Sequence, residues 1–121
     1  MADASTSVEE LKEKVRFFCE ARNWDKFHNP KDLAIGISTE ANELLDIFRF
    51  KSQKEVSQIM KDSKRRNDIG RELADVFYFV LRFAQLNGFD LSNELDKKLM
   101  ENDKKYPVSK AKNSNKKYTE L

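Results

Sequence analysis

Residues 67–88 read NDIGRELADVFYFVLRFAQLNG. Most positions from 73 to 84 are apolar, and no proline interrupts the run. A polar capping residue, Asn67 or Asp68, and a glycine at position 88 predict a helix between them. A helix that is apolar almost all round needs burial on several sides. In so short a chain, we expect another subunit to supply part of that burial.

Further helices are predicted on both sides of this stretch. Ser7 and Glu10 form a capping-box pattern, and Asn29-Pro30 is a cap followed by proline at the first helical position. The predicted helices span 8–22, 30–48, 53–60, 67–87 and a last segment that is capped by Ser92 and ends before Tyr106. Loops are expected at 23–29 and at the polar run 61–66. We expect an all-α bundle of four to five helices, in one domain over 1–121 with flexible ends at 1–6 and 108–121.

Composition narrows the function. The chain has 121 residues with 23 basic and 21 acidic side chains, a net charge of +2. This near balance argues against a protein that coats nucleic acid, which usually carries a strong basic excess. Six lysines follow Asp103, and such a segment either contacts phosphates or is a solvated terminus.

A lone cysteine, Cys19, allows no intrachain disulfide and suits a reducing compartment. Its neighbours predict a buried small side chain more than a nucleophile. Residues 1–7 lack the pattern of a signal peptide, and no apolar run approaches the ~20 residues that cross a bilayer. We therefore expect a cytoplasmic protein without a membrane partner.

Two pairs of acids interrupt the apolar helices. Glu40 and Glu43 are three residues apart, as are Glu72 and Asp75, so each pair shares one helix face. If the two helices pack antiparallel, four carboxylates face one another, and a hard divalent cation is the simplest way to offset their repulsion. The alternative from the residues alone is that these acids pair with nearby basic side chains: Lys31, Arg49, Arg71 or Arg82.

The same residues carry a family resemblance. Glu40-Ala41-Asn42-Glu43 and Glu72-Leu73-Ala74-Asp75 resemble the ExxE…ExxD signature of the MazG-type all-alpha nucleotide pyrophosphohydrolases. The surroundings are most similar to the dCTP pyrophosphatase branch, and the similarity spans roughly residues 8–120. The motifs that carry it are Arg16-Phe17, Arg22-Asn23-Trp24, Phe27-His28, Pro30-Lys31-Asp32-Leu33, Asn102, Tyr106-Pro107 and Lys117-Tyr118.

The resemblance implies a reaction, a metal and an assembly. Family members cleave a nucleoside triphosphate between its α- and β-phosphates, depend on Mg²⁺, and assemble as tetramers built from dimers. Glu40, Glu43, Glu72 and Asp75 match the Mg²⁺ ligands. One of these acids would activate water, and among them we choose Glu43, with Glu40 beside it. The implied substrate is dCTP or a modified dCTP, removed as nucleotide-pool housekeeping.

The resemblance also implies a nucleotide site. His28, Trp24 and Phe50 match positions around the base, Asn102 a position near the sugar and base, and Lys105 and Tyr106 a segment that reaches the phosphates, often in a neighbouring subunit. From the residues alone, a loop histidine such as His28 is more often a surface or capping side chain, and Trp24 is by default a core or interface anchor.

Three positions depart from the family pattern. Thr39 stands where MazG itself has a further glutamate, and Phe50 stands where the branch often has tryptophan. Phe79, which we also expect to bind the substrate, stands where a tyrosine is common. A different substrate, such as dUTP, a broad set of nucleotides or phosphoribosyl-ATP, is therefore an open alternative. So does a non-catalytic helical interaction module, although all four acids are present. A nucleic-acid partner is disfavoured by the charge balance.

Overall fold

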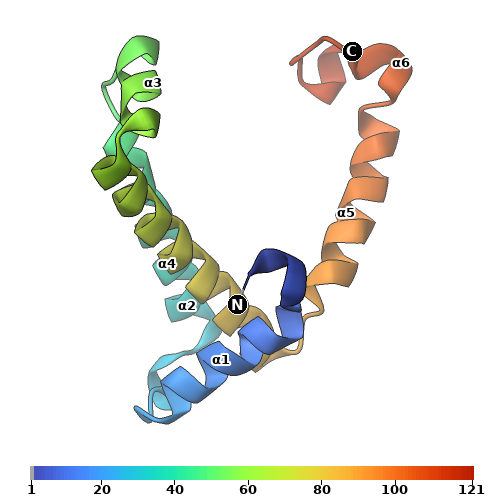
Figure 1. The fold of residues 1–121 in the computed structure, drawn as a ribbon. Helices are drawn as coiled ribbons and strands as arrows, with labels where there is room; N and C mark the ends of the chain where they lie inside the picture. Colours follow the sequence, from blue (N-terminus) through green and yellow to red (C-terminus); the bar gives the residue numbers. More distant parts are fainter. Residues whose placement is uncertain (1) are drawn as a thin grey trace. The chain divides into compact units, whose positions relative to one another are not determined.

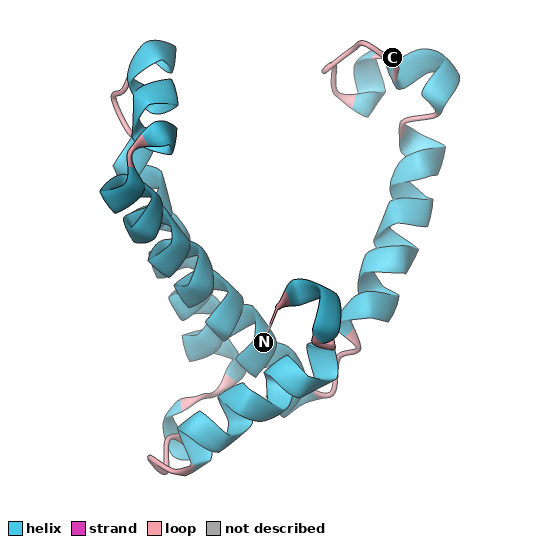
Figure 2. Cartoon of the chain, viewed as in Figure 1, coloured by secondary structure: helices cyan, strands magenta, loops and turns pink. Residues whose placement is uncertain are grey.

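The computed structural model describes residues 2–121, which contain helices and no strand (Figure 2). This confirms the all-α fold class. The chain divides into two compact units, Met1–Gly88 and Phe89–Leu121. Each is described by itself, and the expectation of one domain with flexible ends stays a prediction. Met1, which belongs to the expected flexible start 1–6, lies outside the described residues.

The first unit contains four of the α-helices shown in Figure 1. They are α1 (Val8–Glu20), α2 (Pro30–Phe48), α3 (Gln53–Lys61) and α4 (Ser63–Asn87), with 3-10 turns η1 at Asp3–Ser5 and η2 at Asp25–Phe27. The long helix α4 packs most extensively against α2, and also against α1 and α3. Its central place agrees with the long apolar run 73–84, which offers apolar surface to several neighbouring helices.

Local capping signals set most helix ends. The Ser7–Glu10 capping box begins α1, and the Asn29 side chain accepts a hydrogen bond from the Asp32 backbone at 2.9 Å to begin α2. Gly88 ends α4 in the left-handed conformation, with φ of 73°. These starts and this end confirm the predictions from the sequence, because each signal acts within one helical turn.

Two predicted boundaries were wrong. The run 61–66 is not a loop, since α4 already begins at Ser63, where the Asp62 side chain accepts from the Arg65 backbone at 2.9 Å. Asp62 alone separates α3 from α4, and the lysine and arginines that follow it are good helix formers. In the second unit, Asp90 and not Ser92 caps the next helix, accepting from the Asn93 backbone at 2.9 Å.

The second unit contains α5 (Leu91–Lys105), α6 (Val108–Ala111) and the 3-10 turn η3 (Tyr118–Glu120). The end of α5 before Tyr106 confirms the expected stop ahead of Pro107. The segment after Val108 was expected to be irregular, and α6 and η3 correct that expectation in part. The ring of Tyr118 packs edge-on against that of Tyr106 with centroids 5.9 Å apart, which explains why η3 is ordered locally.

The apolar core of the described residues is small. Within residues 2–121, the buried apolar side chains are Cys19, Leu33, Ile69, Leu81 and Ala84, all in the first unit. The expectation that Cys19 is buried is confirmed, and its Sγ lies 3.0 Å from the Tyr78 hydroxyl. Many large apolar side chains stay exposed, among them Leu73 and Phe77 of α4. No helix within residues 2–121 is both long and apolar enough to cross a membrane.

Candidate metal centre

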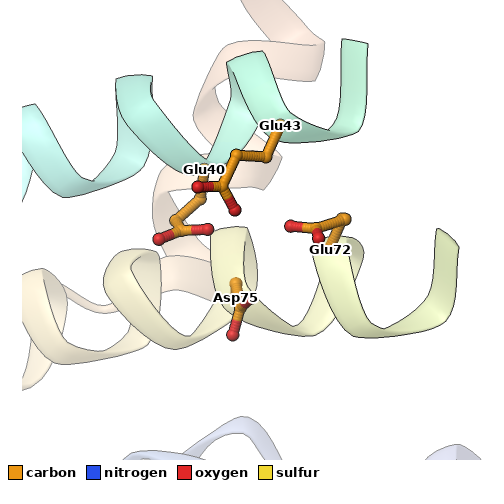
Figure 3. A group of neighbouring side chains, drawn as sticks. All are labelled: Glu40, Glu43, Glu72 and Asp75. Carbon is orange, nitrogen blue, oxygen red and sulfur yellow. The ribbon is translucent and has the colours of Figure 1, made fainter. Parts of the chain in front are cut away.

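Four carboxyl groups converge between α2 and α4. Glu40 and Glu43 project from α2, and Glu72 and Asp75 from α4 (Figure 3). One oxygen of each lies within 4.8 Å of one oxygen of every other. The geometry brings together, in one place, all four acids that the sequence pairs predicted to face each other.

The helices run antiparallel where the acids meet. Glu43 of α2 hydrogen-bonds with Glu72 of α4, whereas the earlier residue Gly36 of α2 contacts the later residue Phe79 of α4. A Cβ added to Gly36 would lie 2.5 Å from Cε1 of Phe79, so glycine lets the ring lie directly on the α2 backbone. Because Gly36 is one turn from Glu40, and Phe79 one turn from Asp75, this contact sets the helix separation at the acids.

The carboxyl groups are in an unfavourable state without a cation. Oε2 of Glu40 and Oε2 of Glu72 are buried and have no hydrogen-bond partner. Burial, and then hydrogen bonding and repulsion from Glu43, raise the pKa of Glu40 to about 7. The same two causes, in the same order, raise the pKa of the Glu72 carboxyl. A buried carboxylate oxygen without a partner costs free energy, so these two point to a missing ligand.

Nearby arginines are engaged with other acids. Arg49 pairs with Asp46 at 3.9 Å, and Arg71 pairs with Asp68 at 2.6 Å. Arg82 pairs with Asp25. The charge of Arg71 lowers the pKa of Glu72, but less than burial and Glu43 raise it. The sequence left open that Lys31 or one of these three arginines pairs with the four acids, and none of the ion pairs found within residues 2–121 joins any of these basic residues to the cluster.

The donor set fits a hard divalent cation. Mg²⁺ and Ca²⁺ take oxygen ligands, and the two unpartnered oxygens of Glu40 and Glu72 supply such ligands from opposite helices. Glu43 and Asp75 are the more exposed members of the cluster. This leaves them accessible to water and to a phosphate that shares the ion.

The predicted base-binding residues of the first unit lie in different settings. Trp24 and His28 flank η2, and their rings meet edge-on with centroids 6.1 Å apart. Phe79 packs against Gly36 and edge-on against Tyr78, with ring centroids 5.0 Å apart. These three side chains are partly buried.

Phe50 differs from them because its side chain is 89% exposed. It follows the end of α2 with φ of 63°, a left-handed conformation that is unusual for a bulky residue. The guanidinium of Arg49 lies 4.6 Å from the centroid of its ring. An exposed aromatic ring on a strained backbone is a feature that a purely structural role does not require.

The predicted residues of the second unit lie at the end of α5. The amide N–H of Tyr106 donates to the carbonyl of Asn102 at 2.7 Å. The ammonium of Lys105 pairs with Glu101 at 3.3 Å and lies 5.1 Å from the centroid of the Tyr118 ring. Lys105 and Tyr106 are thus held by contacts within their own unit.

Sequence reasoning missed one charged cluster. Arg82, which stands alone in an apolar run, is completely buried. Its guanidinium contacts Asp25, His28 and Gln85. The signal in the sequence was a single arginine inside the apolar stretch 73–84, a position where a charge requires a partner.

Comparison with known proteins places the chain in a family. A model of the MazG-like family matches residues 35–121. The dCTP pyrophosphatase 1 of Rattus norvegicus is 30% identical over 115 residues, which cover 95% of this chain and 68% of that protein. The human dCTP pyrophosphatase 1 is 29% identical over the same lengths.

A solved structure is also similar. A pyrophosphatase from Archaeoglobus fulgidus superposes with a TM-score of 0.78 at 31% identity, covering 88% of this chain and 98% of that chain. The family model matches well over half of the chain, and it includes all four acids of the cluster. The chain therefore belongs to the MazG-like family, as the resemblance of its acid pairs implied.

Proposed function

We propose that this chain hydrolyses dCTP or a modified dCTP to the monophosphate and pyrophosphate, with Mg²⁺ as cofactor. The coarser assignment, a nucleoside triphosphate pyrophosphohydrolase, rests on the family and on the relatives named dCTP pyrophosphatase and pyrophosphatase. The observation that carries the proposal is the cluster of Glu40, Glu43, Glu72 and Asp75, in which two buried oxygens lack a partner.

Glu40 and Glu72 are the proposed primary ligands, because each has a buried oxygen without a partner and the two side chains come from different helices of the cluster (Figure 3). Glu43 and Asp75 complete the set. When bound, Mg²⁺ neutralises triphosphate charge and helps generate a nucleophile from water. By holding the ion, the four acids would determine where the negative charge of the triphosphate is neutralised. They would therefore orient the triphosphate indirectly.

Glu43 is the proposed base for the attacking water. It is exposed, unlike Glu40 and Glu72, and its carboxyl group lies beside both of theirs. A carboxylate in this position accepts a proton from water as the oxygen attacks the α-phosphate. Water supplies the new P–O bond, the bond between the α- and β-phosphates breaks, and pyrophosphate leaves.

Aromatic side chains are proposed to bind the base. Phe50 offers an exposed ring for stacking, and Trp24 and His28 form an edge-on pair on the same unit. Phe79 is the proposed floor of this region, held against Gly36. Stacking of a base on an aromatic ring contributes on the order of 1–3 kcal/mol.

Asn102, Lys105 and Tyr106 are proposed to contact the sugar and the phosphates. In an assembly they would reach the nucleotide site of a neighbouring chain. We propose a homotetramer, supported by exposed apolar side chains such as Leu73, which directly follows Glu72. A cytoplasmic location and a role in cleansing the nucleotide pool complete the proposal.

The decisive experiment is pyrophosphate release from a panel of dNTPs and NTPs, with and without Mg²⁺. Wild type is compared with Glu43→Gln and with Glu9→Gln, the same chemical change on the exposed face of α1. We expect dCTP or a modified dCTP to be cleaved fastest, and both Mg²⁺ removal and Glu43→Gln to abolish turnover, while Glu9→Gln is unaffected. No turnover of any nucleotide by the wild type would leave the non-catalytic helical module as the better account.

A further inference from the structure

The side chain of His28 is held by a residue from a distant part of the chain. Nε of Arg82, on α4, donates a hydrogen bond to Nδ1 of His28 at 3.0 Å. Arg82 is completely buried, whereas His28 is only partly buried. A completely buried arginine therefore holds one ring nitrogen of a partly exposed histidine.

Arg82 itself is fixed from three sides. Its Nη1 donates to Oε1 of Gln85 at 2.6 Å, and its Nη2 pairs with the Asp25 carboxylate. Asp25 begins η2, and its backbone carbonyl accepts from the amide N–H of His28 at 3.1 Å. The guanidinium thus ties both ends of one short turn to α4, and it has little freedom to release His28.

This contact determines which ring nitrogen of His28 carries the proton. A guanidinium has only donors and no acceptor, so Nδ1 must offer a lone pair. The proton of the neutral ring is then on Nε2. Within residues 2–121, no hydrogen-bond partner is found for Nε2, so its N–H is available to a ligand.

We propose that Arg82 is a positioning residue that holds His28 as a neutral Nε2–H donor toward an acceptor atom of the bound nucleotide. The proposal rests on the proposed function, in which His28 belongs to the nucleotide site. It limits which atoms of the base can contact His28. A neutral Nε2–H can donate to a ring carbonyl or to an unprotonated ring nitrogen, but it cannot accept a hydrogen bond from an amino group. A cytosine ring presents both kinds of acceptor on one edge.

The charges around His28 favour the neutral ring. Burial and the positive charge of Arg82 lower the pKa of His28, and Asp25 opposes them with a smaller effect. Within residues 2–121, the charges that act on the ring come from Arg82 of α4 and Asp25 of η2. The ring of His28 therefore stays neutral to a lower pH than that of an ordinary histidine.

The wild-type protein allows a direct test, because His28 is the only histidine of the chain. Two-dimensional ¹⁵N–¹H NMR of the imidazole, recorded without nucleotide over pH 4.5–8, reports the tautomer and the pKa of this one ring. We expect the Nε2–H tautomer and a pKa below the ordinary value of about 6.5. An Nδ1–H tautomer, or a pKa at or above that value, overturns the proposal whether or not the protein is an enzyme.

Substitutions then test the consequence for the nucleotide. His28→Asn keeps an acceptor for Arg82 at the position of Nδ1 but has no donor at the position of Nε2. We expect it to raise KM about tenfold, the size of one lost hydrogen bond, with kcat changed less than twofold. An unchanged KM would mean that Nε2 does not meet the nucleotide, and the proposal would fail while the proposed activity stands.

Arg82→Lys tests the support itself, with Arg16→Lys as the control, because Arg16 is a partly buried arginine whose ion pairs with Glu13 and Glu20 lie within α1. Lysine keeps the charge but cannot bridge Asp25, Gln85 and His28 together. We expect a mixture of His28 tautomers and a KM raised about tenfold, by loss of one hydrogen bond, and neither change in the control. A folded Arg82→Lys protein with the wild-type tautomer and KM overturns the positioning role. If this variant does not fold, the wild-type NMR spectrum and the KM of His28→Asn still test the proposal.

Discussion

Gly36 of α2 and Phe79 of α4 are in closer contact than any other side chain would allow at position 36. A Cβ at Gly36 would lie 2.5 Å from Cε1 of the Phe79 ring, and 2.6 and 2.8 Å from two further ring atoms. Both residues are one helical turn from a member of the acid cluster. The spacing of the four carboxyl groups therefore depends on a glycine that carries no chemistry of its own.

Gly36→Ala should destabilise the protein and weaken metal binding. The overlap with the ring forces α2 and α4 apart, at a cost of about 1–3 kcal/mol for an overpacked contact. Denaturant unfolding measures the stability, and the Mg²⁺ concentration for half-maximal activity measures the metal site. We expect the second quantity to rise even at temperatures where the variant is fully folded.

Gly70→Ala is the matched control for that substitution. Gly70 also lies inside a helix, α4, but a Cβ there meets nothing within 4 Å. Alanine is favoured over glycine by about 1 kcal/mol in a helix interior, so this variant should be as stable as wild type or more stable. If both alanine variants behave alike, the contact with Phe79 does not set the helix separation.

Removal of the metal should make stability depend on pH through Glu40. Its pKa is raised from 4.5 to about 7 in the folded chain. The protonated carboxyl therefore stabilises the metal-free fold fully below pH 4.5, and this contribution is lost as the pH rises through about 7. In EDTA, Glu40→Gln should gain stability over wild type as the pH increases from 5 to 8.

Thermal unfolding of both proteins at several pH values checks this prediction. Added Mg²⁺ at pH 8 should raise the Tm of wild type, since the ion binds only the folded site, and the rise should be smaller for Glu40→Gln. Glu9→Gln, on the exposed face of α1, should follow wild type throughout. A stability difference between wild type and Glu40→Gln that is independent of pH would contradict the raised pKa.

The fold was largely predictable because its signals are local. Asn29-Pro30 marks the start of α2 and Gly88 follows the end of α4, and each acts within one turn. The acid pairs were visible because helical spacing places i and i+3 on one face. The start of α4 was missed because Asp62 serves as both the end of α3 and the cap of α4, which leaves no loop to recognise.

The role of Arg82 was not predictable for a different reason. Its partners Asp25 and His28 are 57 and 54 residues away in the chain. No periodicity within one helix reveals such a pairing. From the sequence alone, Arg82 was a possible partner for the acid cluster. The positive φ of Phe50 was hidden as well, because a bulky residue in that conformation contradicts its ordinary preference.

Substitutions of Phe50 can separate the effect of its backbone strain on stability from the effect of its ring on nucleotide binding. Phe50→Gly and Phe50→Ala both remove an aromatic ring that is 89% exposed, and both should raise KM for dCTP about tenfold through lost stacking. Only glycine relieves the left-handed conformation, so Phe50→Gly should be more stable than Phe50→Ala by about 1 kcal/mol. Phe50→Trp should lower KM. An unchanged KM in all three variants would remove Phe50 from the base site.

The assembly is tested by a charge on the exposed face of α4. Phe77 is a large apolar residue with 44% of its surface exposed, two positions after Asp75. If a second chain covers it, Phe77→Glu buries an unpaired carboxylate on assembly, which costs several kcal/mol, whereas in an isolated chain the new charge faces water. Light scattering of the wild type should give about four times the chain mass of 14.2 kDa, and the variant should give a smaller particle with its helical content retained. A wild type that elutes as a single chain would contradict the proposed tetramer and would require another role for the exposed apolar residues of α4.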